Sequence, residues 1–450
     1  MKRVITILLF MALTVLPAAY SQDQGWTLEE CIDYALQNNI GLQRQALQSE
    51  NAAVNLTKSR MGMLPDLNFG TDARLGFGRS IDPVTNLITF KQNISNSYSL
   101  NTSLTLFSGF AALNRLSANK FMLKSGLEAE KVARNTLIVE IMGQYYQVVY
   151  ARGMEEAARL QLEQSERQLE RISRMVETGR EAVAKKYEME SQASADRLTW
   201  TVAQNNASQA VTALRQMLQL EPATEFDILL PSMDRLLIRD TGFDPDSIYG
   251  IASEVLPRLK TIEYELKSSE KRFAAAKGLL APSLSVGGAI YTGYYRVLSD
   301  ESEGQVSYGS QLRNNNSQSL YLTLSIPIFN NYSSYGTVRQ ARIQLEDDRL
   351  RLELEKNNLY TEIENACLSY NRGRDEFLAA EANLQFNTKS FEAVEKKFES
   401  GLVDVTDYAA SKATLFSAGL EALRTRLQLL IRQLTIRFYS TGEYEQLVSN

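Results

Sequence analysis

The chain has 450 residues, 44% of them hydrophobic, with a formal net charge of −5, two cysteines and no histidine. The absence of histidine excludes imidazole acid–base catalysis and histidine-ligated metals, and with two cysteines we expect no structural zinc or iron–sulfur site. The acidic balance supplies no basic surface for nucleic acid, and the sequence contains no Gly-rich phosphate loop or Gly-x-Ser-x-Gly elbow. We therefore predict no enzyme, no catalytic residue, no metal site and no cofactor.

Residues 1–21 have the pattern of an export signal. Lys2 and Arg3 precede an apolar run over 4–16, and Ala19-Tyr20-Ser21 offers small residues at the positions that a signal peptidase reads. The run is short for a spanning helix, so a membrane anchor is the less favoured alternative. No cysteine follows directly, so we expect no lipid at the new N-terminus, and no later apolar run reaches about 18 residues.

Three landmarks recur in the same order about 220 residues later, which predicts a duplicated architecture. The pairs are Leu64-Pro65-Asp66-Leu67 with Ala281-Pro282-Ser283-Leu284, Leu104–Phe107 with Ile326–Phe329, and Val176–Gly179 with Phe398–Gly401. The predicted organisation is a first repeat over 22–220, a linker over 221–245, a second repeat over 246–440 and a tail over 441–450.

Each repeat contains two segments with the period-2 alternation of a strand, apolar on one side and small or polar on the other. The predicted strands are about 66–78, 96–107, 283–295 and 319–328. Half-buried strands of a soluble sheet alternate in the same way, but segments of about ten residues also match transmembrane strands. The polar face favours the membrane interpretation, because it suits a water-filled lumen and because charges would be costly against lipid. Its predicted lumen-facing residues are Asp72, Arg74, Asn101, Ser103, Ser285 and Thr323.

The strands are joined in pairs by polar, turn-rich connections over 79–97 and 296–318. Four strands cannot close a barrel, since the smallest single-chain barrels use about eight. An open edge in lipid would leave backbone groups unpaired. If the strands lie in a membrane, the chain must therefore assemble with copies of itself.

Long helical patterns fill the remainder of each repeat. Helices are predicted over about 27–62, 111–178, 181–220 and 246–277. Heptad seams pass through Leu162, Leu169 and Val176 in the first repeat, and through Leu384, Phe391 and Phe398 and then Leu420, Leu427 and Leu434 in the second. Gly179 and Gly401 lie where one seam ends and another begins, which predicts helix C-caps and tight helical hairpins. Cys31 and Cys367 lie in helical patterns. We favour two unpaired buried thiols for these residues, with a disulfide between them as the alternative.

This order of elements resembles the outer membrane efflux protein family, the TolC-like exit ducts of tripartite pumps and type I secretion systems. The resemblance covers about residues 26–440. Its carriers are Thr27–Leu36, the strand starts at Leu64-Pro65 and Ala281-Pro282, the strand ends at Leu106–Gly109 and Ile328–Asn330, and the tip glycines Gly179 and Gly401.

The resemblance implies a mainly α protein with membrane β-structure. Four strands per chain would contribute to one twelve-stranded barrel of a homotrimer in outer-membrane lipid, and the coiled-coil helices would continue as an α-barrel in the periplasm. A periplasmic adaptor and an inner-membrane transporter of the RND or ABC type would be the partners. The implied function is passage of substrate through a duct.

For the gate, family members place an acidic residue six positions after the second tip glycine. Asp407 occupies that position and Asp404 lies nearby, so three copies would form a cation-sensing ring; a solvated carboxylate in a first helical turn is the equal alternative. The first repeat has Lys185 there. Phe398 and Val403 stand where some members place a Tyr–Arg lock, so that lock is absent. The predicted adaptor contacts are Thr178, Gly179, Arg180, Ser400, Gly401, Leu402 and Val403.

Two other classes compete with a channel. A periplasmic coiled-coil adaptor or structural protein would use the same helices with soluble strands. An exported enzyme with paired carboxylates would need a cleft, whereas the acids here follow helical surfaces and loops. The sequence does not identify the cargo.

Overall fold

The computed structural model describes residues 25–81, 86–89, 92–221, 226–231, 243–298 and 306–442. The predicted export signal over 1–21, most of the linker over 221–245 and the tail beyond 442 lie outside these residues. None of the helices in the described ranges is both long and apolar enough to cross a membrane.

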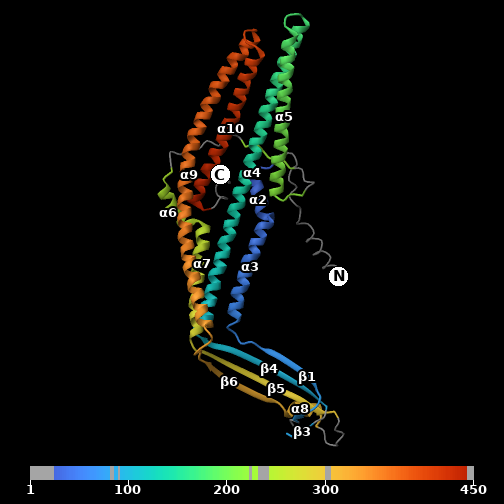
Figure 1. The fold of residues 1–450 in the computed structure, drawn as a ribbon, viewed down its shortest axis with the longest axis vertical. Helices are drawn as coiled ribbons and strands as arrows, with labels where there is room; N and C mark the ends of the chain where they lie inside the picture. Colours follow the sequence, from blue (N-terminus) through green and yellow to red (C-terminus); the bar gives the residue numbers. More distant parts are fainter. Residues whose placement is uncertain are drawn as a thin grey trace, which may run out of the picture. The chain divides into compact units, whose positions relative to one another are not determined.

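The long helices and the main sheet strands follow the same order twice (Figure 1). The first half has α2 (Leu28–Asn38), α3 (Ile40–Met61), β1 (Asn68–Gly76), β2 (Ser80–Ile81), β3 (Ile88–Thr89), β4 (Asn93–Ser108), α4 (Ala111–Glu177) and α5 (Val183–Met217). The second half has α6 (Pro245–Val255), α7 (Pro257–Lys277), the 3₁₀ turn η2 (Gly278–Leu280), β5 (Ser283–Val297), α8 (Tyr308–Asn314), β6 (Ser317–Ser325), α9 (Ser333–Glu399) and α10 (Val405–Thr441). The long helices α4 and α9 have 67 residues each, about 100 Å of helix. The mainly α fold with a duplicated helix–strand–strand–hairpin unit is confirmed.

The opening helix of each repeat is broken, where the sequence predicted one continuous helix. Asn39 separates α2 from α3 in an extended conformation, and its side-chain oxygen accepts from the N–H of Leu42 at 3.1 Å. Leu256 separates α6 from α7 in the same way, because a residue before proline, here Pro257, is disfavoured in the α region. The two breaks lie at corresponding positions of the repeats.

The chain divides into two compact units, and the boundaries fall inside or between helices. One unit comprises residues 45–130 and 257–356 and contains the sheet; the other comprises the remaining segments and contains both helical hairpins. In the sheet unit the strand order is β1-β4-β5-β6, and every neighbouring pair is antiparallel. β6 ends at Ser325, before the predicted boundary, and Pro327 beyond it has no N–H for a ladder.

The hairpin unit has a core built from heptad positions. Cys31 of α2, Ile141 and Val148 of α4, and Leu214 of α5 are fully buried together with residues of α10. Each such side chain contributes about 1.5–3 kcal/mol on burial. Cys31 and Cys367 are both buried and free, and burial raises the pKa of the Cys31 thiol to about 12. The Cys31 thiol is therefore protonated and unreactive at neutral pH.

Candidate channel surfaces: a two-faced sheet and the hairpin tips

The sheet has two chemically different faces. Because opposite residues of an antiparallel pair point to the same side, the register assigns each side chain to one face. One face carries Phe69, Thr71, Ala73, Leu75, Ile94, Asn96, Tyr98, Leu100, Thr102, Leu104, Leu284, Val286, Gly288, Ile290, Thr292, Tyr294, Arg296, Gln318, Leu320, Leu322 and Leu324, which are mainly apolar. We call this set the apolar face.

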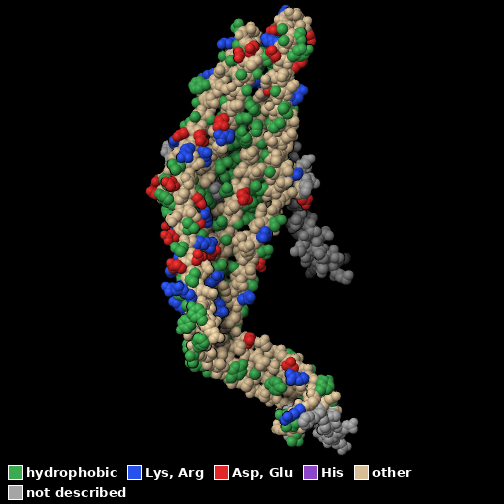
Figure 2. Space-filling view, in the orientation of Figure 1, with side chains coloured by type: hydrophobic (Ala, Val, Ile, Leu, Met, Phe, Trp, Pro, Cys, Tyr) green, Lys and Arg blue, Asp and Glu red, His purple; other side chains and the backbone are tan. Residues whose placement is uncertain are grey.

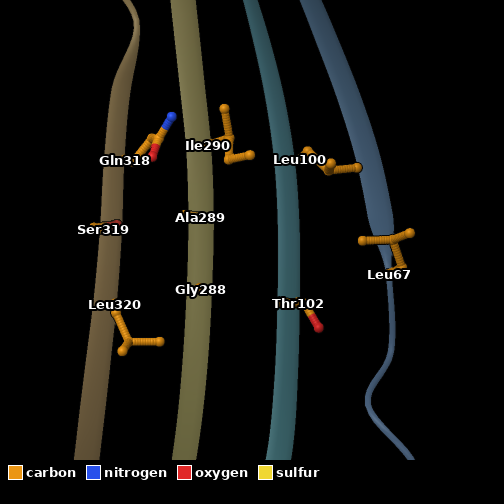
Figure 3. Close-up of a pocket in the computed structure, with 9 residues that line it drawn as sticks. All are labelled: Leu67, Leu100, Thr102, Gly288, Ala289, Ile290, Gln318, Ser319 and Leu320. Carbon is orange, nitrogen blue, oxygen red and sulfur yellow. The ribbon is translucent and has the colours of Figure 1, made fainter.

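The apolar face is uncovered. Phe69, Leu320 and Leu322 are 67%, 83% and 66% exposed. The one side of the sheet that Figure 2 shows carries few charged side chains. Contiguous exposed apolar surface marks a protein or membrane contact. A hollow of about 440 Å³ lies on this face, and Figure 3 shows Leu67, Leu100, Ile290 and Leu320 around a floor that contains Gly288 and Thr102.

All six predicted lumen-facing residues share the opposite, polar face. The register places Asp72 opposite Ser97, Arg74 opposite Ser95, Asn101 opposite Asn68, Ser103 opposite Gly287, and Ser285 opposite Thr105 and Thr323. The predicted lumen-facing set contained no tyrosine, although Tyr321 lies on the same polar face. The Tyr321 ring lies over Gly287, where an added Cβ would come within 2.3 Å of it. Glycine at that position therefore makes room for the ring.

Aromatic rings mark both ends of the apolar face. Near α8 the hydroxyls of Tyr98 and Tyr308 are 2.6 Å apart, and the Tyr294 and Tyr308 ring centroids are 4.7 Å apart. At the opposite end Phe107 contacts Phe110 edge-on at 5.3 Å. Tyr98 and Phe107 are separated along β4 by about 30 Å, or about 23 Å in depth for a strand tilted by about 40°. This matches the apolar band, about 25 Å tall between aromatic girdles, of outer-membrane barrels.

The segment after β5, predicted as a loop, contains the short helix α8. Pairing of β5 with β6 ends at Tyr291, and beyond it the Gln311 side chain bonds the β5 backbone where a strand would otherwise do so. The N–H of Tyr295 donates to Gln311 Oε1 at 3.0 Å, and Gln311 Nε2 donates back to the Tyr295 carbonyl at 3.0 Å. Asn315 Nδ2 donates to the Gly293 carbonyl at 2.8 Å. Side-chain amides thus satisfy this part of the β5 edge, and the sequence pattern offered no sign of it.

The first hairpin tip turns through a Schellman motif at the end of α4. Gly179 has φ +69°, its N–H donates to the Val176 carbonyl at 3.0 Å, and the N–H of Arg180 donates to the Met175 carbonyl at 2.8 Å. The left-handed conformation favours glycine. Beside it, Thr178 bonds its hydroxyl back to the helix carbonyls.

The second tip has the same geometry 222 residues later. Gly401 has φ +75°, and the N–H groups of Gly401 and Leu402 donate to the carbonyls of Phe398 and Lys397 at 3.1 and 2.9 Å. Leu402 is 77% exposed. Ser400, Gly401 and Leu402 are all exposed, so an apolar side chain stands free at this tip.

The two acidic gate candidates differ in local role. Asp404 is the N-cap of α10, and its Oδ1 accepts from the N–H of Asp407 at 2.8 Å. Asp407 lies in the first turn and is exposed. A carboxylate there is favourable for the helix dipole, so the alternative of a solvated first-turn acid stands beside the gate hypothesis.

The tip contacts between the two hairpins do not use a Tyr–Arg lock. Lys185 Nζ lies 3.0 Å from Glu181 Oε1 and 5.5 Å from the Phe398 ring centre, and Arg171 Nη2 donates to the Glu399 carbonyl at 2.7 Å. Lys185, which occupies in the first repeat the position that Asp407 has in the second, is therefore paired with Glu181 of its own hairpin. Below these contacts a small core joins the hairpins through Ile172, Met189, Phe391, Phe398, Val405 and Tyr408.

A buried polar cluster lies one helical turn beyond this core, and sequence reasoning missed it. Lys412 and Asp196 are both 3% exposed and 2.9 Å apart. Lys412 Nζ also donates to Ser165 Oγ at 2.6 Å, while Gln161 and Gln192 donate to Asp196 Oδ1 at 2.8 and 3.0 Å. Desolvation lowers the pKa of Lys412, against the opposing effect of Asp196. The cluster ties α4, α5 and α10 together.

One signal would have located Lys412. It follows Val405 by seven residues and Tyr408 by four, which is the spacing of the buried face of α10. A lysine on such a face requires a buried partner. Nothing in the sequence alone points to Asp196 as that partner.

Comparison with known proteins agrees with this geometry. The outer membrane efflux protein family model matches residues 31–219 and 249–442. No curated protein matches the chain. Among solved structures, a crystal structure of CusC shares 17% identity with a TM-score of 0.78, covering 95% of this chain and 98% of that chain.

Two further structures have the same fold at similar distance. The Campylobacter jejuni CmeC outer membrane channel is 14% identical with a TM-score of 0.76, covering 95% of this chain and 91% of its own. The open-state Neisseria gonorrhoeae MtrE outer membrane channel is 16% identical with a TM-score of 0.75, covering 96% and 94%. The family is one of channel-forming proteins and not of enzymes. The chain belongs to the outer membrane efflux protein family and is an outer-membrane channel for efflux.

Proposed function

We propose that three copies of the chain form one exit duct that receives substrate from an inner-membrane transporter of the RND or ABC type through a periplasmic adaptor. The observation that carries this proposal is the sheet, which has one exposed apolar face, one polar face and two open edges. In lipid such a sheet leaves backbone groups unpaired unless copies close it. β1 and β6 run antiparallel to each other, so copies joined edge to edge continue the antiparallel order.

The helices near the sheet support assembly in the same way. On α3 the residues Leu47, Val54 and Met61 recur every seven positions and are at least half exposed. On α9 Ile343 and Leu350 have the same spacing and exposure. Unpartnered heptad stripes of this kind are contact surfaces between helices of different chains.

Assembly is tested by the mass of the protein extracted from outer-membrane fractions. We expect a particle of three chains of about 50 kDa each, which conducts ions when it is inserted into planar bilayers. A monomer that partitions with soluble protein would overturn the proposal and restore the adaptor alternative.

We further propose that the hairpin tips contact the adaptor and that Asp407 gates the duct. Three exposed carboxylates around a narrow opening would bind multivalent cations. Asp407→Asn is expected to abolish block of the bilayer current by hexamminecobalt added on the helical side. Asp404→Asn keeps the helix cap, because asparagine also caps a helix, and its effect on the block measures what the second candidate carboxylate contributes. Equal block in wild type and Asp407→Asn would remove Asp407 from the gate.

A further inference from the structure

The two edge strands of the sheet have equal length but lie at different levels. β1 and β6 have nine residues each, against 16 in β4 and 15 in β5. Through β4, β1 lies level with Ala289–Val297 of β5. β6 lies level with Ser283–Tyr291 of β5. The two edges are therefore offset by six residues along the strand direction.

This offset is compatible with a closed barrel. Six residues correspond to about 20 Å along a strand, and four strands occupy about 19 Å across the sheet. A sheet that closes on copies of itself with this offset has strands tilted by about 45°, at the upper end of the range for barrels. The bulge in the β4–β5 pair lies between Thr105 and Phe107, outside the stretch of β4 that pairs with β1, and does not alter the offset.

The offset is also an even number of residues, so the apolar face and the polar face each continue from one chain to the next. A shift by an odd number would place Asp72 and Arg74 of β1 on the apolar face of the neighbouring chain. A shift by four or eight keeps the faces but leaves two residues of each edge strand unpaired. Only a shift by six pairs all nine residues of both strands.

From these relations we infer the register of the seam between copies: β6 of one chain pairs antiparallel with β1 of the next, from Ser325 opposite Asn68 to Ser317 opposite Gly76. The partner is a second copy of this chain, and the inference rests on the proposed assembly. On the polar face Ser319 meets Arg74 and Tyr321 meets Asp72. On the apolar face Leu324 meets Phe69, Leu322 meets Thr71 and Leu320 meets Ala73.

The seam places the Asp72 and Arg74 charges beside hydroxyl groups of the next chain. All nine residues of β6 are exposed in the single chain, and Asp72 and Arg74 are exposed as well. Closure in this register sets the exposed leucines of β6 beside Phe69, Thr71 and Ala73 of the next chain and keeps Asp72 and Arg74 off the apolar face.

Engineered disulfides test the register. Opposite residues of an antiparallel pair lie within bridging distance, whereas diagonal neighbours lie at about 7–8 Å between Cα atoms, too far to bridge without backbone movement. Within one chain, positions 319 and 74 lie on opposite edges of the sheet and six residues apart in level, a separation of about 24 Å, so only copies can be crosslinked. In outer membranes, oxidation of Ser319→Cys/Arg74→Cys should give a covalent ladder that ends at three chains.

The matched controls are Ser319→Cys/Asp72→Cys and Ser319→Cys/Gly76→Cys, which keep the face and shift the partner by one row. They are expected to crosslink at least tenfold less. A ladder from either control in place of the first pair overturns the register but keeps the assembly. No ladder from any pair, together with a monomeric mass, overturns both. Leu320→Cys/Ala73→Cys repeats the test on the apolar face in case the first pair does not fold, and it must give the same ladder.

Discussion

At the scale of single residues, the hairpin unit buries one ion pair inside a polar cluster. Asp196 and Lys412 are each 3% exposed and satisfy one another through a 2.9 Å contact and shared partners. Removing one member of such a pair leaves an uncompensated charge in a low-dielectric site, which costs about 3–5 kcal/mol. Removing both replaces the pair by apolar contact and is much less costly.

A double-mutant cycle tests this coupling. Asp196→Leu and Lys412→Met should each destabilise the helical unit by about 3–5 kcal/mol, because the other charge stays buried. The double variant should be less destabilised than either single variant, because no unpaired charge then stays buried. The measurement is thermal loss of helical circular dichroism in detergent. Strict additivity of the two changes would show that the pair is not energetically coupled.

Glu395 provides a pH-dependent prediction. Partial burial, and then the nearby Glu399, raise the pKa of Glu395 above its usual 4.5, while Arg167 and Lys412 oppose the shift. A raised folded-state pKa means that this carboxyl favours the folded state below pH 4.5, and that the advantage is lost as pH rises through the raised pKa. Glu395→Gln should therefore raise the unfolding temperature at pH 8 and leave it unchanged near pH 4. Glu381→Gln is the control, because Glu381 is an exposed carboxyl of the same helix that does not contribute to the Glu395 shift, and it should show no such difference.

At the scale of elements, the hairpin tips depend on backbone conformation more than on side-chain contact. Gly179 and Gly401 have positive φ, and an added Cβ on either would meet no atom within 4 Å. Any cost of substitution therefore comes from the left-handed conformation itself.

Gly401→Ala is expected to destabilise the second hairpin by about 1–2 kcal/mol. Gly143 is the matched control, because it lies inside α4 and its added Cβ also meets nothing within 4 Å. Gly143→Ala should instead stabilise by about 0.5–1 kcal/mol, since alanine favours a helix interior. Thermal unfolding of both variants supplies the measurement, and the same sign in both would contradict the Schellman assignment.

At the scale of the whole molecule, adjacent residues of one strand are expected to face lipid and water in turn. Leu322 lies on the apolar face and Thr323 on the polar face of β6, and both are exposed in the single chain. Leu322→Arg should reduce assembly in the outer membrane, because arginine against lipid costs about 2–4 kcal/mol near the midplane. Thr323→Arg should assemble normally. The yield of membrane-extracted oligomer measures both, and equal yields would remove the distinction between the faces.

Much of the fold was predictable from the sequence because it depends on short-range patterns. Period-2 alternation located the sheet strands and sorted Asp72, Arg74 and the other polar residues onto one face. The paired glycines marked the hairpin turns, since few other residues adopt positive φ without strain. The breaks at Asn39 and Leu256 were missed, although Pro257 was a visible signal for the second.

The sequence by itself determined where the long helices and the four main sheet strands lie, which face of each strand is apolar, and that the plan occurs twice, because these properties repeat over a few residues. Only the tertiary structure decided the six-residue offset of the edge strands, the pairing of Gln311 with β5, and the meeting of Asp196 with Lys412. Each of these depends on which distant segments become neighbours. Residues that lie 216 positions apart in the chain leave no periodic trace of their contact.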